Sequence, residues 1–329
     1  MTSLKVLFIG GTGVISSACA NHAAAAGIDL TILNRGMTTV RPIPNDAEVL
    51  HGDVRDPDFA REALGDRTFD VVVDFVAFTP QHVQADIDLF AGRIGQYVFI
   101  SSASAYQTPP ARLPILESTP LRNPRWQYSR DKIACEDLLV AAYRNTGFPA
   151  TIVRPSHTYD RTLVPLIGDW IALDRMRRGQ AVVVPGDGTS LWTLTHHADF
   201  AKGFVGLLGH PQAIGDSFHI TSDEVLTWNQ IYEAMAAAAG VEPHLVHVAS
   251  ETIAAALPDL GPGLLGDKAH SAIFDNSKVK GLVPGYVATI PFAAGAREIV
   301  AWYDADPHRR TVDADLDAGF DKLVAAAAR

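Results

Sequence analysis

Two side chains with complementary chemistry, Tyr128 and Lys132, open a helical pattern over residues 128–145. A spacing of four residues places both side chains on one face of a helix, one turn apart. A free tyrosine has a pKa of about 10, and nearby positive charge favours the phenolate, so we expect the pKa of Tyr128 to fall toward working pH. Tyr128 would then act as a general acid/base on a hydroxyl or carbonyl group.

A run of serines, Ser101, Ser102 and Ser104, follows a strand predicted over residues 97–100. Ligands bind at the carboxyl ends of strands in open α/β sheets, and a hydroxyl there can donate to a reacting oxygen. Ser102 is the predicted catalytic serine, and Ser104 is the second choice. Serines at such positions also cap turns without any chemical role.

A glycine-rich turn is the candidate element for binding a ligand near Tyr128, Lys132 and the serines. It joins the apolar run 4–9 to a helix of small residues predicted over 14–26, and it reads Gly10-Gly11-Thr12-Gly13-Val14-Ile15-Ser16. Gly10 permits a tight turn, and Gly13 lets the backbone approach a diphosphate at the helix N-terminus. Ser16 replaces the third glycine of the usual pattern. We expect a dinucleotide to contact Gly10, Thr12, Gly13, Val14 and Ile15, with a plain strand-to-helix turn as the alternative.

The end of the second predicted strand carries information about the type of dinucleotide. Asn34 and Arg35 stand where an NAD-binding fold usually places an acid for the ribose 2′-hydroxyl. Without that acid a 2′-phosphate is not repelled, and Arg35 could pair with it. NADP(H) is therefore favoured and NAD(H) is possible. The alternative for Arg35 is a solvent-facing residue that begins a loop.

The first half of the chain alternates apolar runs with helical patterns, which predicts a doubly wound parallel sheet of the Rossmann type. Residues 1–155 are expected to bind the dinucleotide, and residues 156–329 to form a smaller mixed α/β substrate lobe, with segments near 195–215 returning to the first part. The predicted strands cover residues 30–33, 49–50, 71–76, 97–100 and 150–153, and short isolated strands follow at 181–184, 218–221 and 245–248. The predicted helices cover residues 58–64, 81–91, 128–145, 198–208, 228–239 and 315–328.

Composition excludes several classes of protein. The net charge of −10 argues against a general nucleic-acid surface. No apolar run reaches the roughly 18 residues of a membrane span, and no secretory signal is evident, which together favour a cytoplasmic protein. Cys19 and Cys135 are best explained by packing. His196 and His197 are adjacent on a predicted strand and would point to opposite faces, so no metal is expected.

Several segments together resemble those of extended short-chain dehydrogenases/reductases, which include NAD-dependent sugar epimerases and dehydratases. They occur in the family's order over about residues 6–240: GGTGVIS, HGDVRD, FISSASAY, ESTPLRNP, YSRDK, RPSHTYD and PGDGTS…THHADF. The resemblance implies Ser102, Tyr128 and Lys132 as the catalytic set and a homodimer through the helix that bears the last two. It also implies a cofactor site that includes Asp53, Val54, Ala77, Phe78, Ser101, Tyr128, Lys132 and Pro155.

Departures from the family's pattern bear on the substrate. Trp192 stands where nucleotide-sugar enzymes place an arginine for the substrate diphosphate, and His157 replaces a common asparagine. A free sugar, a glycoside or another polyol could stack on Trp192 and hydrogen-bond to His157 and Ser104. Trp192 as ordinary core and His157 as a structural histidine are the alternatives.

The leading hypothesis is hydride transfer on a secondary alcohol or ketone of a sugar-like substrate, by an epimerase or by a dehydrogenase/reductase. An Asp-Glu pair typical of dehydratases is not evident beside Ser102, where Ala103 and Ser104 stand. A non-enzymatic NADP(H) sensor or an RNA-binding member of the superfamily is the alternative. Sensors commonly lack the tyrosine that this chain keeps as Tyr128.

Overall fold

The apolar runs of the first half form one parallel sheet. In the computed structural model, which describes residues 3–38 and 40–328, seven strands lie in the order β11-β6-β5-β4-β1-β2-β3. Every neighbouring pair in this sheet is parallel. The strands are β1 (Lys5–Ile9), β2 (Asp29–Asn34), β3 (Glu48–His51), β4 (Phe69–Asp74), β5 (Ile94–Ile100), β6 (Ala150–Pro155) and β11 (Ser217–Ile220). The predicted Rossmann-type sheet is therefore confirmed.

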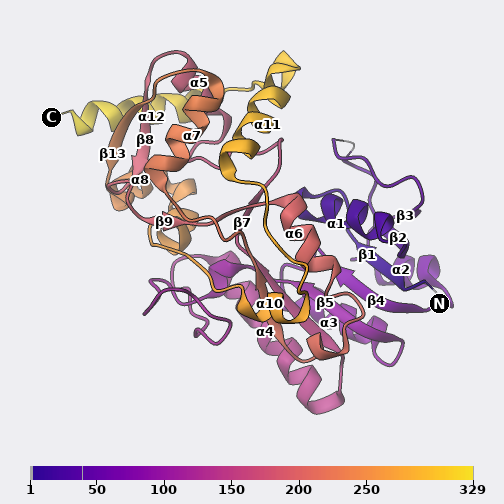
Figure 1. The fold of residues 1–329 in the computed structure, drawn as a ribbon. Helices are drawn as coiled ribbons and strands as arrows, with labels where there is room; N and C mark the ends of the chain where they lie inside the picture. The colour runs from indigo at the N-terminus through magenta and orange to yellow at the C-terminus, as the bar shows by residue number, and fades with distance from the viewer. Residues whose placement is uncertain (1–2, 39, 329) are drawn as a thin grey trace.

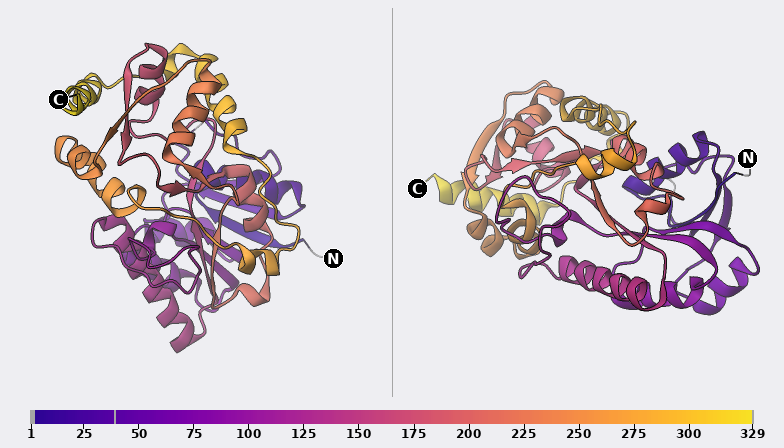
Figure 2. Two further views of the ribbon diagram at one scale, coloured as in Figure 1. Left: turned by 60° about the vertical axis from the view of Figure 1, so that its left-hand side comes forward. Right: turned by 60° about the horizontal axis from the view of Figure 1, so that its bottom comes forward.

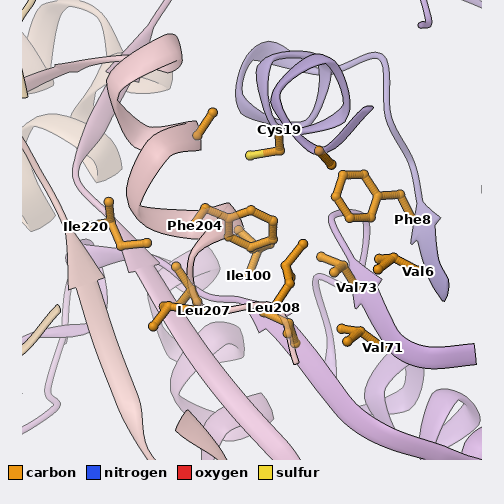
Figure 3. Packing of buried hydrophobic residues seen from close by; sticks show 14 of the residues in the cluster. Val6, Phe8, Cys19, Val71, Val73, Ile100, Phe204, Leu207, Leu208 and Ile220 are labelled. Atoms are coloured by element: carbon orange, nitrogen blue, oxygen red, sulfur yellow. The ribbon is translucent and has the colours of Figure 1, made fainter. Parts of the chain in front are cut away.

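Helices cover both faces of the sheet (Figure 1). They are α1 (Val14–Ala25), α2 (Pro57–Leu64), α3 (Pro80–Phe90), α4 (Gln127–Thr146) and α6 (His197–Val205). Alternate residues of β1 point to opposite faces, so Phe8 packs in a core with α1 and α6, and Leu7 in a core with α2, α3 and α4. Figure 3 shows the first of these cores, with Cys19 of α1 near Phe204 of α6. Both cysteines are free and buried, which confirms packing as their role.

The order of strands reverses between β1 and β4, because β2 and β3 extend the sheet on one side and β5, β6 and β11 on the other. In doubly wound sheets this switch point opens a crevice at the carboxyl ends of the strands. The glycine turn after β1 and the loop after β4 flank that crevice.

The short strands of the second half are not isolated, contrary to expectation. Residues 217–220 form β11, which pairs with β6 at the edge of the main sheet. The strands β8 (Ala181–Pro185) and β13 (His244–Val248) pair with each other in parallel. The backbone groups of a lone strand would be left without partners, and these pairings satisfy them.

Most of the remaining elements gather beside the carboxyl ends of the sheet, with the C-terminal helix at the end of the molecule far from β1 (Figure 2). The helix α10 (Ser277–Leu282) instead packs next to β11, in the core that contains α1 and α6. The helices are α5 (Trp170–Arg177), α7 (Trp228–Ala239), α8 (Ser250–Ala256), α9 (Gly261–Gly263), α10 (Ser277–Leu282), α11 (Phe292–Asp304) and α12 (Ala314–Ala327). Two further strand pairs form separate two-stranded sheets: β7 (His157–Tyr159) with β10 (Leu194–His196), and β9 (Leu191–Trp192) with β12 (Leu226–Thr227). Among the described residues, no helix combines the length and apolar character that crossing a membrane requires.

Candidate active site

The glycine turn adopts the conformation that its sequence predicts. Gly10 and Gly11 have positive φ angles of 103° and 130°, which side chains other than glycine rarely tolerate. A Cβ atom on Gly11 would lie 2.7 Å from Ile32 Cγ2. The N–H of Gly13, the N-cap of α1, donates to Ser16 Oγ at 2.8 Å, and Ser16 itself is buried. The serine in place of the third glycine thus still allows close packing of the helix.

A groove of about 330 Å³ lies at the switch point, beside this turn. Seven residues of the predicted cofactor set line it: Gly10, Thr12, Asn34, Arg35, Asp53, Val54 and Phe78. Gly13 caps α1, and Val14 and Ile15 form the first turn of that helix. The amide Nδ2 of Asn34 is buried and finds no hydrogen-bond acceptor among the described residues. An unpaired buried donor at the end of β2 fits a bound ligand that supplies an acceptor, as the ribose of a dinucleotide would.

Arg55 is a residue of this groove that the sequence reasoning missed. Its guanidinium donates to Asp74 Oδ2 at 2.6 Å and to Asp86 Oδ1 at 3.1 Å. Burial raises the pKa of Asp86, with further contributions from Asp74. The signal was present in HGDVRD, where Arg55 follows Asp53 by two residues. Nothing in that spacing shows that the arginine turns toward two buried carboxylates of β4 and α3.

Lys132 is buried and contacts one residue of the groove, Phe78, and one residue of a second cavity, Tyr128. Its ammonium donates to the carbonyl oxygens of Ala77 and Ile100, both at 2.7 Å. It is 4.8 Å from the centre of the Phe78 ring and 5.7 Å from that of Tyr128. Burial lowers the pKa of Lys132 to about 8. The ammonium is thus fixed by the loop after β4 and by the end of β5.

Tyr128 departs from the expected titration. Burial raises its pKa, and the hydrogen bond with Ser102 lowers it only in part. The expected fall in this pKa depends on Lys132 and an oxidised nicotinamide together; the lysine does not bring it about by itself, because its ammonium is turned to two carbonyl oxygens. A lowered pKa therefore requires a positive charge beyond the lysine.

The serines form a chain of hydroxyl groups beside Tyr128. Ser129 Oγ donates to Ser104 Oγ at 2.8 Å, Ser104 Oγ lies 2.9 Å from Ser102 Oγ, and Ser102 lowers the pKa of Tyr128. Ser101 points elsewhere and donates to Glu136 Oε1 at 2.5 Å. The structure thus brings Ser102, Ser104, Tyr128 and Lys132 together, and gives the Ser101 side chain a buried partner away from the groove.

A second cavity, of about 260 Å³, contains the predicted substrate residues. Ser102, Ser104, Tyr128, Pro155, His157 and Trp192 all line it. Trp192 is largely buried, stacks on Trp228 and donates from Nε1 to His157 Nδ1 at 3.1 Å. The acceptor role of Nδ1 leaves the ring proton of neutral His157 on Nε2. Burial lowers the pKa of His157 to about 3, so the ring is an uncharged donor.

Asp267 is the other residue that sequence reasoning missed. It lies with Lys268 in a π-helical turn (Leu264–Lys268) and lines the second cavity with Tyr128 and Trp126. The Lys268 ammonium is 3.8 Å from Asp267 Oδ2. Burial raises the pKa of Asp267 to about 6. Single-turn π-helical segments occur frequently at functional sites.

Replacing Asp267 with asparagine is expected to stabilise the protein near neutral pH. The folded-state pKa of about 6 exceeds the usual 3.8, so above about pH 6 the folded chain holds a carboxylate that burial disfavours. Asp267→Asn removes this cost and should raise the free energy of unfolding by about 1–3 kcal/mol near pH 7. The gain should vanish below about pH 3, where both states are protonated. Urea unfolding at the two pH values tests this, with the exposed Asp259→Asn as the control.

The adjacent histidines belong to different elements. His196 ends β10 and contacts Glu298 Oε2 through Nε2 at 3.1 Å, whereas His197 begins α6 and contacts the Val14 carbonyl through Nδ1 at 3.1 Å. Within residues 3–38 and 40–328, no three His, Cys, Asp or Glu side chains gather as metal ligands would.

A doubly wound sheet with a glycine turn after its first strand defines a dinucleotide-binding protein of the Rossmann class. Residues 6–221 match the NAD dependent epimerase/dehydratase family, and the chain belongs to this family. The family name supports an enzyme of this kind with NAD as its cofactor.

Individual relatives differ in what they do. The chain is 26% identical to 2'-dehydrokanamycin reductase of Streptomyces kanamyceticus, over 98% of this chain and 90% of that protein. It is 27% identical to chloroplast stem-loop binding protein of 41 kDa b of Arabidopsis thaliana, over 74% of this chain and 65% of the plant protein, just under two thirds of its length. A UDP-glucose 4-epimerase from Bifidobacterium longum, solved with NAD+ and UDP, shares the fold with a TM-score of 0.72 at 19% identity, over 92% of this chain and 99% of that one.

Proposed function

We propose that the protein transfers hydride between a nicotinamide cofactor and a secondary alcohol or ketone of a sugar-like substrate, with Tyr128 as the general acid/base. The observation that carries this proposal is that Tyr128 and Ser102 line one cavity, while Lys132 joins Tyr128 to Phe78 in the lining of the dinucleotide groove. We also propose that residues 1–155 bind the cofactor, since the groove is lined from Ile9 to His82, and that 156–329 complete the substrate site.

The bound nicotinamide supplies or accepts the hydride. Tyr128 takes the proton of the substrate hydroxyl during oxidation and returns it to the carbonyl oxygen during reduction. Ser102 donates to the same oxygen, and Ser104 and Ser129 hold Ser102 in place through the chain of hydroxyl groups. Lys132 would anchor the nicotinamide ribose, and the positive charge of an oxidised nicotinamide would be the further charge that favours the phenolate.

Two features favour a dehydrogenase or reductase over a nucleotide-sugar epimerase. Trp192, at the position where nucleotide-sugar enzymes are expected to carry an arginine, is buried and stacked on Trp228, so it supplies no charge for a diphosphate. The similarity to a reductase that acts on a dehydrokanamycin runs over nearly the whole chain. A dehydrogenase or reductase releases the used cofactor and binds a fresh one in each catalytic cycle, and we expect this exchange here.

The test is a screen of sugar-like alcohols, including methyl glycosides, aminocyclitols and UDP-glucose, with each oxidised cofactor. We expect reduced nicotinamide to appear with a substrate that lacks a nucleotide and to disappear when the matching ketone is added. Turnover of UDP-glucose alone, with no net formation of reduced cofactor, would replace this proposal by an epimerase.

A preference for NADP(H) is expected from Arg35, which is exposed at the rim of the groove, with the buried amide of Asn34 next to it. Arg35→Ser should weaken NADP+ binding about tenfold or more, since a charge-assisted hydrogen bond to a 2′-phosphate contributes roughly 1.5–3 kcal/mol. NAD+ binding should change little. Calorimetric titration of both proteins with both cofactors measures this, and an equal loss for the two would contradict a 2′-phosphate contact.

RNA binding is the second candidate, favoured by the similarity to the chloroplast stem-loop binding protein. The net charge of −10 opposes it, because the nucleic-acid backbone requires positive charge for affinity. Retention of Tyr128, Lys132 and Ser102 also favours an enzyme.

A further inference from the structure

A third cavity, here called the apolar annex, adjoins the substrate cavity. Its volume is about 490 Å³. Its apolar lining includes Leu163, Val164, Leu166, Leu260, Leu264 and Leu316, from the loop after β7, from the turns before and after α9, and from α12. Trp126, His157 and Lys268 line both cavities. A ligand held beside Tyr128 can therefore extend into the annex past these three side chains.

The charges around the two cavities do not suit a diphosphate. Among the described residues, Lys268 is the only lysine or arginine in either lining, and the Asp267 carboxylate lies 3.8 Å from its ammonium. Asp259 and Asp169 add two more carboxyl groups at the annex, of which Asp169 accepts from the backbone N–H of Val164 at 3.1 Å. A nucleotide diphosphate would bring further negative charge to a site with three carboxyl groups and one ammonium.

The polar wall of the substrate cavity suits a ligand rich in hydroxyl groups. The Asp267 carboxylate accepts no hydrogen bond from the described residues, and the neighbouring Lys268 ammonium is too far for one. An ionised carboxylate of this kind is an acceptor for substrate O–H or N–H groups. His157 offers its Nε2–H as a donor in the same lining.

We propose that the natural substrate is a phosphate-free, sugar-like molecule that carries an apolar substituent. Its hydroxyl-bearing ring lies between Tyr128 and Asp267, and the substituent occupies the apolar annex. This inference rests on the proposed function, because it assigns the ring to the cavity of Tyr128. In the proposed substrate, an apolar group takes the place of the nucleotide diphosphate of nucleotide-sugar substrates. Burial of that group among leucines contributes favourable free energy to binding.

The experiment compares three probes: phenyl β-D-glucopyranoside, methyl β-D-glucopyranoside and UDP-glucose. Binding is followed by tryptophan fluorescence, since Trp126 borders both cavities, in the full chain with and without NADP+. We expect the phenyl glucoside to bind about tenfold or more tightly than the methyl glucoside, from the added apolar area. UDP-glucose should bind no more tightly than the methyl glucoside. The inference is overturned if UDP-glucose binds more tightly than the methyl glucoside. It is also overturned if the phenyl glucoside binds no more tightly than the methyl glucoside, or if neither glucoside binds.

Variants separate the annex from the ring site. Leu260→Asn should remove most of the preference for the phenyl glucoside and leave the affinity for the methyl glucoside unchanged. Val287→Asn, at an exposed valine outside both cavities, is the matched control and should alter neither. Asp267→Asn should weaken both glucosides by a similar factor of about ten. A Leu260→Asn protein that melts normally yet keeps the full preference counts against the annex.

The proposed function can fail independently of this inference. NADPH fluorescence on titration reports cofactor binding without any sugar. A chain that binds no cofactor but prefers the phenyl glucoside contradicts the proposed function and supports the annex. A chain that binds cofactor and oxidises UDP-glucose in preference to both glucosides supports hydride transfer and overturns the annex.

Discussion

Tyr128→Phe is expected to lower the turnover number by about 10²–10⁴-fold, because the variant loses the proton-transfer group and keeps the ring. The phenylalanine ring can still pack against Trp126, whose ring centre lies 5.0 Å from that of Tyr128. Cofactor affinity should therefore change by less than about threefold, well under the tenfold change to which about 1.4 kcal/mol of binding free energy corresponds. Steady-state kinetics with the substrate found in the screen, together with cofactor titration, measure both quantities.

Tyr143→Phe is the matched control for this substitution. Tyr143 lies on the same helix α4 but is exposed on the surface, at 41% of its full accessibility, so its variant should retain full activity. A Tyr128→Phe protein with normal turnover would contradict the assignment of Tyr128 as the acid/base. Unchanged biological activity of that variant would favour the RNA-binding or sensor alternative.

Arg154→Leu is expected to lower the free energy of unfolding by about 3–5 kcal/mol, the usual result of removing one partner of a buried ion pair. Arg154 on β6 and Glu136 on α4 form a two-pronged contact, with nitrogen–oxygen distances of 2.9 and 2.5 Å, and both side chains are buried. Ser101 and Tyr106 complete the set of hydrogen bonds. Loss of the arginine leaves the Glu136 carboxylate without its counter-charge.

The double variant Arg154→Leu/Glu136→Leu separates the charge effect from packing. Replacing both partners by apolar groups is often nearly neutral, so the double variant should recover most of the lost stability. Chemical denaturation of the two proteins gives the comparison. A double variant as unstable as Arg154→Leu would show that the shape of the pair matters more than its charge. Because Glu136 lies one turn beyond Lys132 on α4, the pair also fixes the helix that carries the candidate catalytic residues.

The sequence alone predicts the parts of this fold that depend on local pattern. The glycine turn, the buried parallel strands and the Tyr128–Lys132 helix are encoded by neighbours in the chain, and the structure forms them within a few residues of the predicted bounds. The position of residues 217–220 depends instead on pairing with β6, which begins 67 residues earlier at Ala150. No local pattern specifies such a long-range partner.

In the candidate site, too, the residues that depend on local sequence could be predicted, and those that depend on distant contacts could not. Ser102, Ser104 and Tyr128 come together because each follows a predictable strand end or helix start. Asp267 reaches the cavity only through a π-helical turn in a segment without any pattern that sequence reasoning could use. Arg55 turns inward because Asp74 and Asp86, distant in sequence, are buried beside it. The cofactor roles of individual residues, the homodimer and the cytoplasmic location stay predictions.

Calorimetric titration of the purified protein with NADP+ and NAD+, after removal of any bound nucleotide, decides whether it binds a nicotinamide cofactor. We expect saturable binding of one equivalent of cofactor, with NADP+ favoured, and loss of that binding when Gly10 at the positive-φ position of the turn is replaced by valine. A correctly folded protein that binds neither cofactor would contradict the assignment of a nicotinamide-dependent enzyme.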